Sequence, residues 1–400
     1  MDATDRSTLD KTLSLKDLVL FGVISIFGSG GFNLIGHALI NGGDYWPIAL
    51  GGAAALFLGS SRTYEQAFNE FKSNSSESDF LEKAFGKSAS YATMLSIIIF
   101  SIFSMATILV LCVRILIPDT TWLTQSFTAV SIVGLMGLFS LKGINANKDL
   151  VNISSGILVF ILSSLSLLGF GGFFQKGVSN VPEVAEVPEP SLVQSFLYFF
   201  YILAGFDVLM KFSEETKDSN DVPKSFYISN IIGIIFVLGL SLAVVNFTDL
   251  KKAKPLERAI GFMLNNISGM NIRHYFSVIS VFFMIITMFV TFLATTRYIF
   301  SLGDKYESLK FMTKLNENKV PTVPIIATTA VVATTVLINH FGTLVSIADL
   351  ALGGFLFLVA AAATKSKYDK GETPIVEGLT AAGFISVFTA TALNNIPFIF

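Results

Sequence analysis

Charged residues are scarce in this sequence. Asp, Glu, Lys and Arg make up 14% of its 400 residues, whereas an ordinary soluble domain has about 25%. Mean hydropathy is +0.67, and the formal net charge of -2 is too small to indicate a nucleic-acid or acidic partner. The scarcity of charge therefore excludes an ordinary soluble domain and points to a membrane protein.

Residues that usually build catalytic or metal sites are also rare. Cys112 is the only cysteine, which excludes an intramolecular disulfide and a cysteine metal site. The three histidines, His37, His274 and His340, lie far apart near the ends of apolar runs. Without a cluster of His, Cys or paired acids, we expect no enzyme activity, no metal and no cofactor. The polar N-terminus lacks the basic region and cleavage site of a signal peptide, so the first apolar run is expected to be retained as a helix.

What the sequence does have is a series of apolar runs of about 20 residues, separated by short polar loops, which is typical of a polytopic helical membrane protein. We therefore expect an all-α fold with about 11 transmembrane helices. In order, the runs are Leu15–Leu39, Tyr45–Phe68, Tyr91–Ile117, Trp122–Leu141, Val151–Phe174, Leu192–Phe212, Phe226–Phe247, Tyr275–Leu302, Val323–His340, Leu344–Ala363 and Ile375–Leu393, with the alternative that the last run continues into the apolar tail Ile396–Phe400.

Lysine and arginine are unevenly distributed between the loops, and this bias predicts orientation. The N-terminal tail and every second loop carry Arg6, Lys11, Lys16, Lys72, Lys83, Lys87, Lys142, Lys148, Lys211, Lys217, Lys224, Lys305, Lys310, Lys314, Lys319, Lys365, Lys367 and Lys370. The opposite side has Lys176 and one loop that is an exception to the bias, Lys251–Arg273. That loop holds the sequon Asn266-Ile267-Ser268, which indicates that it faces outward. We expect a cytoplasmic N-terminus; the sequence does not identify the membrane.

The first run is interrupted by Gly28-Ser29-Gly30-Gly31-Phe32. Each glycine costs about 1 kcal/mol of helix propensity relative to alanine, and unwound backbone at membrane depth is tolerated only where it is buried in protein or lines a cavity. We interpret the stretch as a break that builds a binding site. The alternative is that the glycines only allow close helix packing.

The sixth run is interrupted at the corresponding place, by Ala204-Gly205-Phe206-Asp207. A period of five spans gives two halves of opposite orientation, and interrupted helices at matching positions of inverted halves indicate the site of a secondary transporter. The predicted division is residues 1–14 as a cytoplasmic tail, 15–174 as a first five-helix repeat, 175–191 as an extracytoplasmic Pro-rich linker, 192–363 as a second repeat and 364–400 as a C-terminal extra helix.

These motifs resemble those of the amino acid–polyamine–organocation superfamily. The resemblance rests on the glycine stretch and on five further motifs in the same order: Thr63-Tyr64-Glu65, Phe85-Gly86, Ala204-Gly205-Phe206-Asp207 with Glu214-Glu215-Thr216-Lys217-Asp218 and Val222-Pro223, Thr296-Arg297-Tyr298 and Val320-Pro321. It implies a 5+5 inverted-repeat transporter with a ten-helix core. Aspartate at position 207 is similar to the cationic amino acid transporter branch. The chain departs from the family at Asp218-Ser219-Asn220, where many relatives have a proline, and in lacking a full twelfth helix.

The broken helices predict how a substrate binds. Amides at a new helix N-terminus favour an anion, and carbonyls that lose their helical partners suit an ammonium, which only donates. A zwitterion satisfies both, and the resemblance implies the same division, with amides to the carboxylate and carbonyls to the α-amino group. The candidate substrate-binding residues are Ser25, Ile26, Ser29, Gly30, Gly31, Tyr201, Ala204, Gly205, Phe206 and Asp207.

Charged and hydroxyl side chains inside the runs have more than one interpretation. Asp207 would take up a coupled proton, contact a cationic substrate or hold the broken helix, against a purely structural role. Arg297 and Asp349 lie nearer run ends, where snorkelling or structural pairing is expected. Glu214, Glu215 and Lys217 are expected to form a solvated cluster. Hydroxyls of Thr291, Thr295 and Thr296 would ligate sodium, or bond their own helix.

The sequence as a whole predicts a secondary transporter that moves an amino acid across a bilayer by alternating access, coupled to a proton or sodium ion or by exchange. A polyamine or organic-cation transporter is the alternative within that class, and a cationic substrate would require Asp207 to face the site. A sensor that kept the fold without transport is the alternative from another class.

Overall fold

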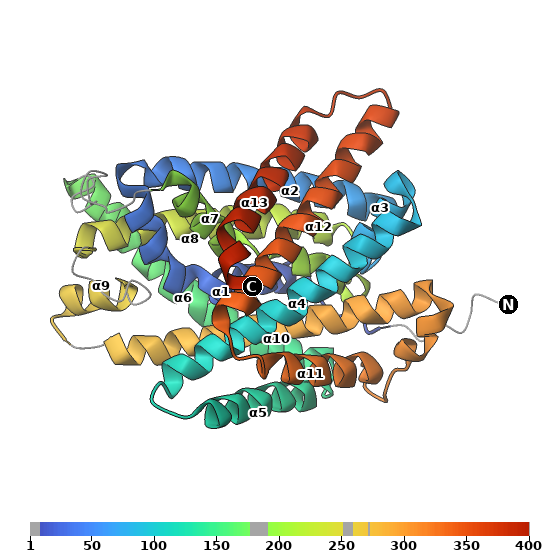
Figure 1. Ribbon diagram of the computed structural model, residues 1–400, viewed down its shortest axis with the longest axis horizontal. Helices are drawn as coiled ribbons and strands as arrows, with labels where there is room; N and C mark the ends of the chain where they lie inside the picture. Colours follow the sequence, from blue (N-terminus) through green and yellow to red (C-terminus); the bar gives the residue numbers. More distant parts are fainter. Residues whose placement is uncertain (1–8, 177–190, 251–258, 271–272, 400) are drawn as a thin grey trace.

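The computed structural model describes residues 9–176, 191–250, 259–270 and 273–399 (Figure 1). It consists of helices, and the described residues contain no strand beyond two isolated bridges. The elements are α1 Leu15–Gly42, η1 Gly43–Tyr45, α2 Trp46–Phe71, α3 Ser76–Phe85, α4 Lys87–Leu116, α5 Trp122–Ser140, α6 Ile144–Lys176, α7 Leu192–Leu203, η3 Phe206–Glu215, α8 Asp221–Phe247, α9 Ala259–Ser268, α10 Arg273–Lys305, η5 Glu307–Thr313, α11 Thr322–Val336, α12 Phe341–Asp369 and α13 Ile375–Ile399.

The predicted all-α membrane fold is confirmed, and every apolar run coincides with a helix. By length and composition, eight helical segments of the described chain are able to cross a membrane, or up to nine when the bent segment of α1 and α2 is included. The apolar helix α11 has 15 residues and is shorter than these. The predicted number of about 11 spans is reached only when α1, α2 and α11 are each counted as a separate span.

Helix α1 lies at the centre of the fold, packed against α6, α7, α8 and α10. It begins with a capping box, in which the Ser14 hydroxyl accepts from the Asp17 amide while the Asp17 carboxylate accepts from the Ser14 amide at 2.8 Å. The predicted interruption of this helix takes the form of a bend. Residues Leu15–Gly42 are helical throughout, but Leu15–Gly28 makes an angle of 53° with the segment that begins at Gly31.

The predicted interruption of the sixth run is a true break. Helix α7 ends at Leu203, Ala204 is extended, and Gly205 has φ +126° before the chain enters η3. Only glycine adopts that conformation readily, because it lacks a Cβ. By length and composition, the whole segment Leu192–Glu215 is able to cross a membrane as one span that contains this break.

Several elements lie outside the apolar runs. Helix α3 folds inward from the loop between the second and third runs, and its Glu77 and Phe80 are buried.

Helices α12 and α13 form a long hairpin, while α5 and α11 lie side by side along one edge (Figure 1). The apolar tail continues α13 to Ile399. The predicted linker falls largely on 177–190 and the charged loop partly on 251–258 and 271–272, outside the described residues.

Candidate substrate site

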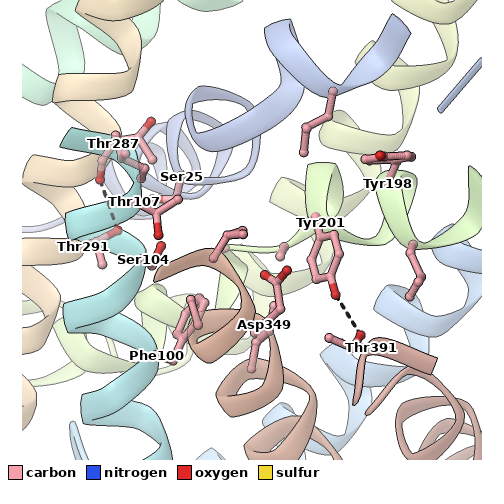
Figure 2. A pocket seen from close by; sticks show the side chains of 18 of the residues that line it. Ser25, Phe100, Ser104, Thr107, Tyr198, Tyr201, Thr287, Thr291, Asp349 and Thr391 are labelled. Carbon is pink, nitrogen blue, oxygen red and sulfur yellow. Dashed lines mark hydrogen bonds between the residues drawn. The ribbon is translucent and has the colours of Figure 1, made fainter. Parts of the chain in front are cut away.

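A cavity of about 330 Å³ lies where the bent helix α1 meets the broken span α7–η3 (Figure 2). Helices α4, α10, α12 and α13 complete its walls. The lining combines apolar and polar side chains. The polar and charged residues that line it are Ser25, Ser104, Thr107, Gln194, Tyr198, Tyr201, Asp207, Thr287, Thr291, Asp349 and Thr391.

The cavity extends toward the membrane face opposite the start of α1. Its lining includes Leu34 in the second half of α1, Gln194 near the start of α7 and Phe341 at the start of α12. The start of α7 lies beside the end of α1, because the Ser191 amide donates to the Asn41 carbonyl at 3.1 Å. The cavity therefore begins at the breaks and runs toward that far face.

Five of the predicted residues line this cavity: Ser25, Tyr201, Ala204, Gly205 and Asp207. The two interrupted spans are in direct contact, because a Cβ on Gly205 would lie 2.7 Å from the Ser25 carbonyl oxygen and 3.2 Å from the Ile26 nitrogen. The Ser25 hydroxyl is buried and has no hydrogen-bond partner among the described residues. Since α7 ends at Leu203, the carbonyls of its last turn lack intrahelical partners.

The other predicted residues are not in the lining. The Ile26 side chain packs against Gly233 of α8, and Gly31 lies against the Phe27 ring. The Phe206 ring packs edge-on against Tyr64, with centroids 5.0 Å apart. The structure describes Ser29 and Gly30 as helical backbone only. In this conformation their amides belong to a helix, so their predicted role toward a carboxylate stays a prediction.

The alternative interpretation of the first glycine stretch holds at Gly28. A Cβ there would lie 1.7 Å from Thr287 Oγ1 and 2.9 Å from the Phe283 carbonyl oxygen on α10. The Thr287 hydroxyl donates to the Ile24 carbonyl at 2.6 Å. Gly28 therefore allows α1 and α10 to pack closely beside the cavity.

Asp207 is part of a buried charge triad. Lys211 Nζ lies 2.9 Å from Asp207 Oδ2 and 3.2 Å from Glu77 Oε1 of α3. The prediction that Lys211 belongs to a cytoplasmic loop is wrong, because η3 carries its side chain into the protein, where it is 2% exposed. Glu77 Oε2 has no partner among the described residues, and burial raises the pKa of Glu77 although Lys211 opposes that shift. The triad shares one positive charge between two carboxylates.

Buried contacts close the cavity on the side where α1 begins. Arg297 of α10 holds Glu215 through two hydrogen bonds of 3.1 Å, and both side chains are buried. The structural pairing predicted for Arg297 is therefore confirmed. The prediction of a solvated Glu215 is wrong, because the end of η3 packs beneath α10 and brings this carboxylate to Arg297. The hydroxyls of Ser78 and Tyr298 are 2.5 Å apart on the same side.

The sequence matches a model of the family described as amino acid permease, over residues 13–399. The chain belongs to the amino acid permease family. It is a multi-pass membrane protein of that family. It is also similar to an inner membrane transport protein of Escherichia coli, YbaT, with 25% identity over 268 residues. That match covers 64% of this chain and 60% of the relative.

One functional group of this permease was not found from the sequence. Asp349 of α12 lines the cavity, and Figure 2 shows its carboxylate directed toward Tyr201. Helix α12 begins at Phe341 and places Asp349 in its third turn, and the snorkelling or structural pairing expected for this residue stays a prediction. Within the described part of the chain, no basic nitrogen lies within 4.0 Å of it. An acid inside an apolar run was the signal that pointed to it.

The hydroxyls considered for sodium in the permease bond their own helix. Thr291 donates to the Thr287 carbonyl at 3.2 Å, Thr295 to the Thr291 carbonyl and Thr296 to the Leu293 carbonyl, both at 2.7 Å. This is the back-bonding alternative. Among the described residues, no group of three or more His, Cys, Asp or Glu side chains is placed to hold a metal ion.

Proposed function

We propose that this permease carries an amino acid through the cavity by alternating access. The observation that carries the proposal is the meeting of two interrupted spans at one cavity, with Gly205 against the Ser25 carbonyl. Interrupted helices of inverted halves are where secondary transporters bind their substrates. The family supports transport, and the geometry supports the place where the substrate binds.

The chemistry at the breaks fits the amino end of an amino acid. The carbonyls at the end of α7 accept hydrogen bonds, as an ammonium requires. The unpartnered Ser25 hydroxyl adds a further polar contact in the same wall. The substrate carboxylate would take the amides of Ser29, Gly30 and Gly31, which requires the bend in α1 to open when substrate binds.

The two sides of the cavity differ in the way that alternating access requires. The side where α1 begins is closed by Arg297–Glu215 and by the triad around Lys211. The lining on the other side runs to the ends of the helices. With the N-terminus on the cytoplasmic side, as the Lys and Arg bias predicts, the closed side faces the cytoplasm. The division into repeats at 15–174 and 192–363 is part of the same proposal, as is coupling to a proton or sodium gradient.

Uptake by purified protein in liposomes tests the proposal. We expect a labelled amino acid to accumulate, and to do so only under an imposed proton or sodium gradient or in exchange for internal amino acid. Protein-free liposomes are the control. Binding without flux under every gradient would favour a sensor, and uptake restricted to polyamines would favour the organic-cation alternative. Either result would contradict the proposal.

A further inference from the structure

The Asp349 carboxylate is the one acid in the cavity lining that lacks a basic partner within the described residues. Asp207, the other acid of the lining, is held by Lys211 at 2.9 Å. The neighbours of Asp349 are neutral: its carboxylate is directed toward Tyr201, and the Tyr201 hydroxyl lies 2.8 Å from Thr391 Oγ1 (Figure 2). These groups orient the carboxylate without compensating its charge.

A carboxylate inside the membrane is costly unless a positive charge compensates it, and such residues mark substrate or ion pathways. Asp349 lines the cavity, so a compensating charge is able to reach it from there. The charge of the Asp349 carboxylate therefore has to be compensated by a cation that enters the cavity with the substrate.

The cavity offers two places for positive groups. The first is the end of α7, where carbonyls at the break suit an α-amino group. The second is Asp349. The lining also includes the apolar side chains of Leu197, Ala348 and Leu352, which suit an aliphatic stem.

We infer that Asp349 binds the side-chain cation of the substrate, so that the permease selects amino acids with a basic side chain. The α-amino group of the substrate meets the broken helix, its methylene stem lies along the apolar wall, and its terminal ammonium or guanidinium pairs with Asp349. Tyr201 links the two places, because its carbonyl belongs to the last turn of α7 and the Asp349 carboxylate is directed toward it. This inference rests on the proposed function and specifies its substrate class.

Competition against labelled substrate in liposomes tests it. Lysine and norleucine form a matched pair, because they share the same carbon chain and differ by the terminal amine. For the unaltered protein we expect lysine and arginine to compete about 10- to 100-fold more strongly than norleucine, the range of a charged hydrogen bond. Asp349→Asn should reduce that ratio to near 1 by weakening the competition by lysine and arginine. Asp349→Glu should retain the preference, and Asp119→Asn, on an exposed loop, is the matched control for the change of charge.

Each outcome has a distinct meaning. If no amino acid is taken up at all, the proposed function is wrong, and the inference about Asp349 is wrong with it. If norleucine competes as well as lysine in the unaltered protein, the inference is overturned although transport stands. If neutral amino acids are the substrates and Asp349→Asn abolishes only the pH dependence of their uptake, Asp349 binds a proton and the inference is again overturned. A loss of the lysine preference in Asp349→Asn but not in Asp349→Glu supports it.

Discussion

Replacing Gly205 with alanine should separate the two interrupted spans. Two costs follow from the structure. Gly205 has φ +126°, a conformation that costs a non-glycine residue about 1–3 kcal/mol. The new Cβ would also lie 2.7 Å from the Ser25 carbonyl oxygen. Because that atom is backbone and cannot rotate away, the overpacking should cost a further 1–3 kcal/mol or so.

Together the two costs come to about 2–6 kcal/mol, which is at least about 30-fold in an equilibrium constant. Gly205→Ala should therefore lower the melting temperature and abolish uptake, since Ser25 and Gly205 both form walls of the cavity. The single, buried Cys112 makes the measurement simple, because a thiol-reactive dye will report unfolding through one site.

Gly156→Ala in α6 is the matched control. A Cβ there meets nothing within 4 Å, so the same substitution should stabilise the helix by about 0.5–1 kcal/mol. The two variants are thus expected to shift the melting temperature in opposite directions. Equal melting temperatures, with uptake retained in Gly205→Ala, would refute the close contact between the interruptions.

Two further predictions concern the buried triad. Lys211→Met should lower the free energy of unfolding by about 3–5 kcal/mol, because it leaves the carboxylates of Asp207 and Glu77 buried without a cation. The triple variant Glu77→Gln, Asp207→Asn, Lys211→Met should recover most of the lost melting temperature. A triple variant that melts no higher than Lys211→Met would contradict this reasoning. Burial raises the pKa of Glu77 above its ordinary value of 4.5, so the folded state binds a proton more strongly than the unfolded state, and stability should fall as pH rises from 4.5 through the folded pKa. Glu77→Gln should flatten that dependence in melting curves, and identical slopes for the two proteins would argue against it.

Much of the fold followed from the sequence because membrane helices depend on local composition. A run such as Phe226–Phe247 has to satisfy its backbone internally, and only a helix does so. The break at Gly205 was also visible, since Ala204-Gly205 interrupts an apolar run with a residue suited to positive φ. The first glycine stretch was less certain, because close packing and unwinding favour the same residue. The structure shows a bend in which Gly28 serves packing.

The charged contacts did not follow from the sequence because they join distant segments. Lys211 and Glu77 are 134 positions apart, and they meet only because α3 folds inward from a loop. Asp349 was visible as an acid in an apolar run, but the sequence does not determine which side of α12 faces a cavity. Its depth also depended on the three additional residues at the start of that helix.

Glu215 connects three segments that are far apart in the chain. Its carbonyl accepts from the amides of Thr12 at 2.9 Å and Leu13 at 3.0 Å, and its carboxylate is held by Arg297. The Lys217 amide returns the contact by donating to the Leu13 carbonyl at 2.9 Å. Glu215 therefore joins three segments at one point: the residues just before α1, the η3 half of the broken span, and α10. A movement that admits water from the side where α1 begins must therefore either move these three segments together as a rigid unit or break the contacts of Glu215.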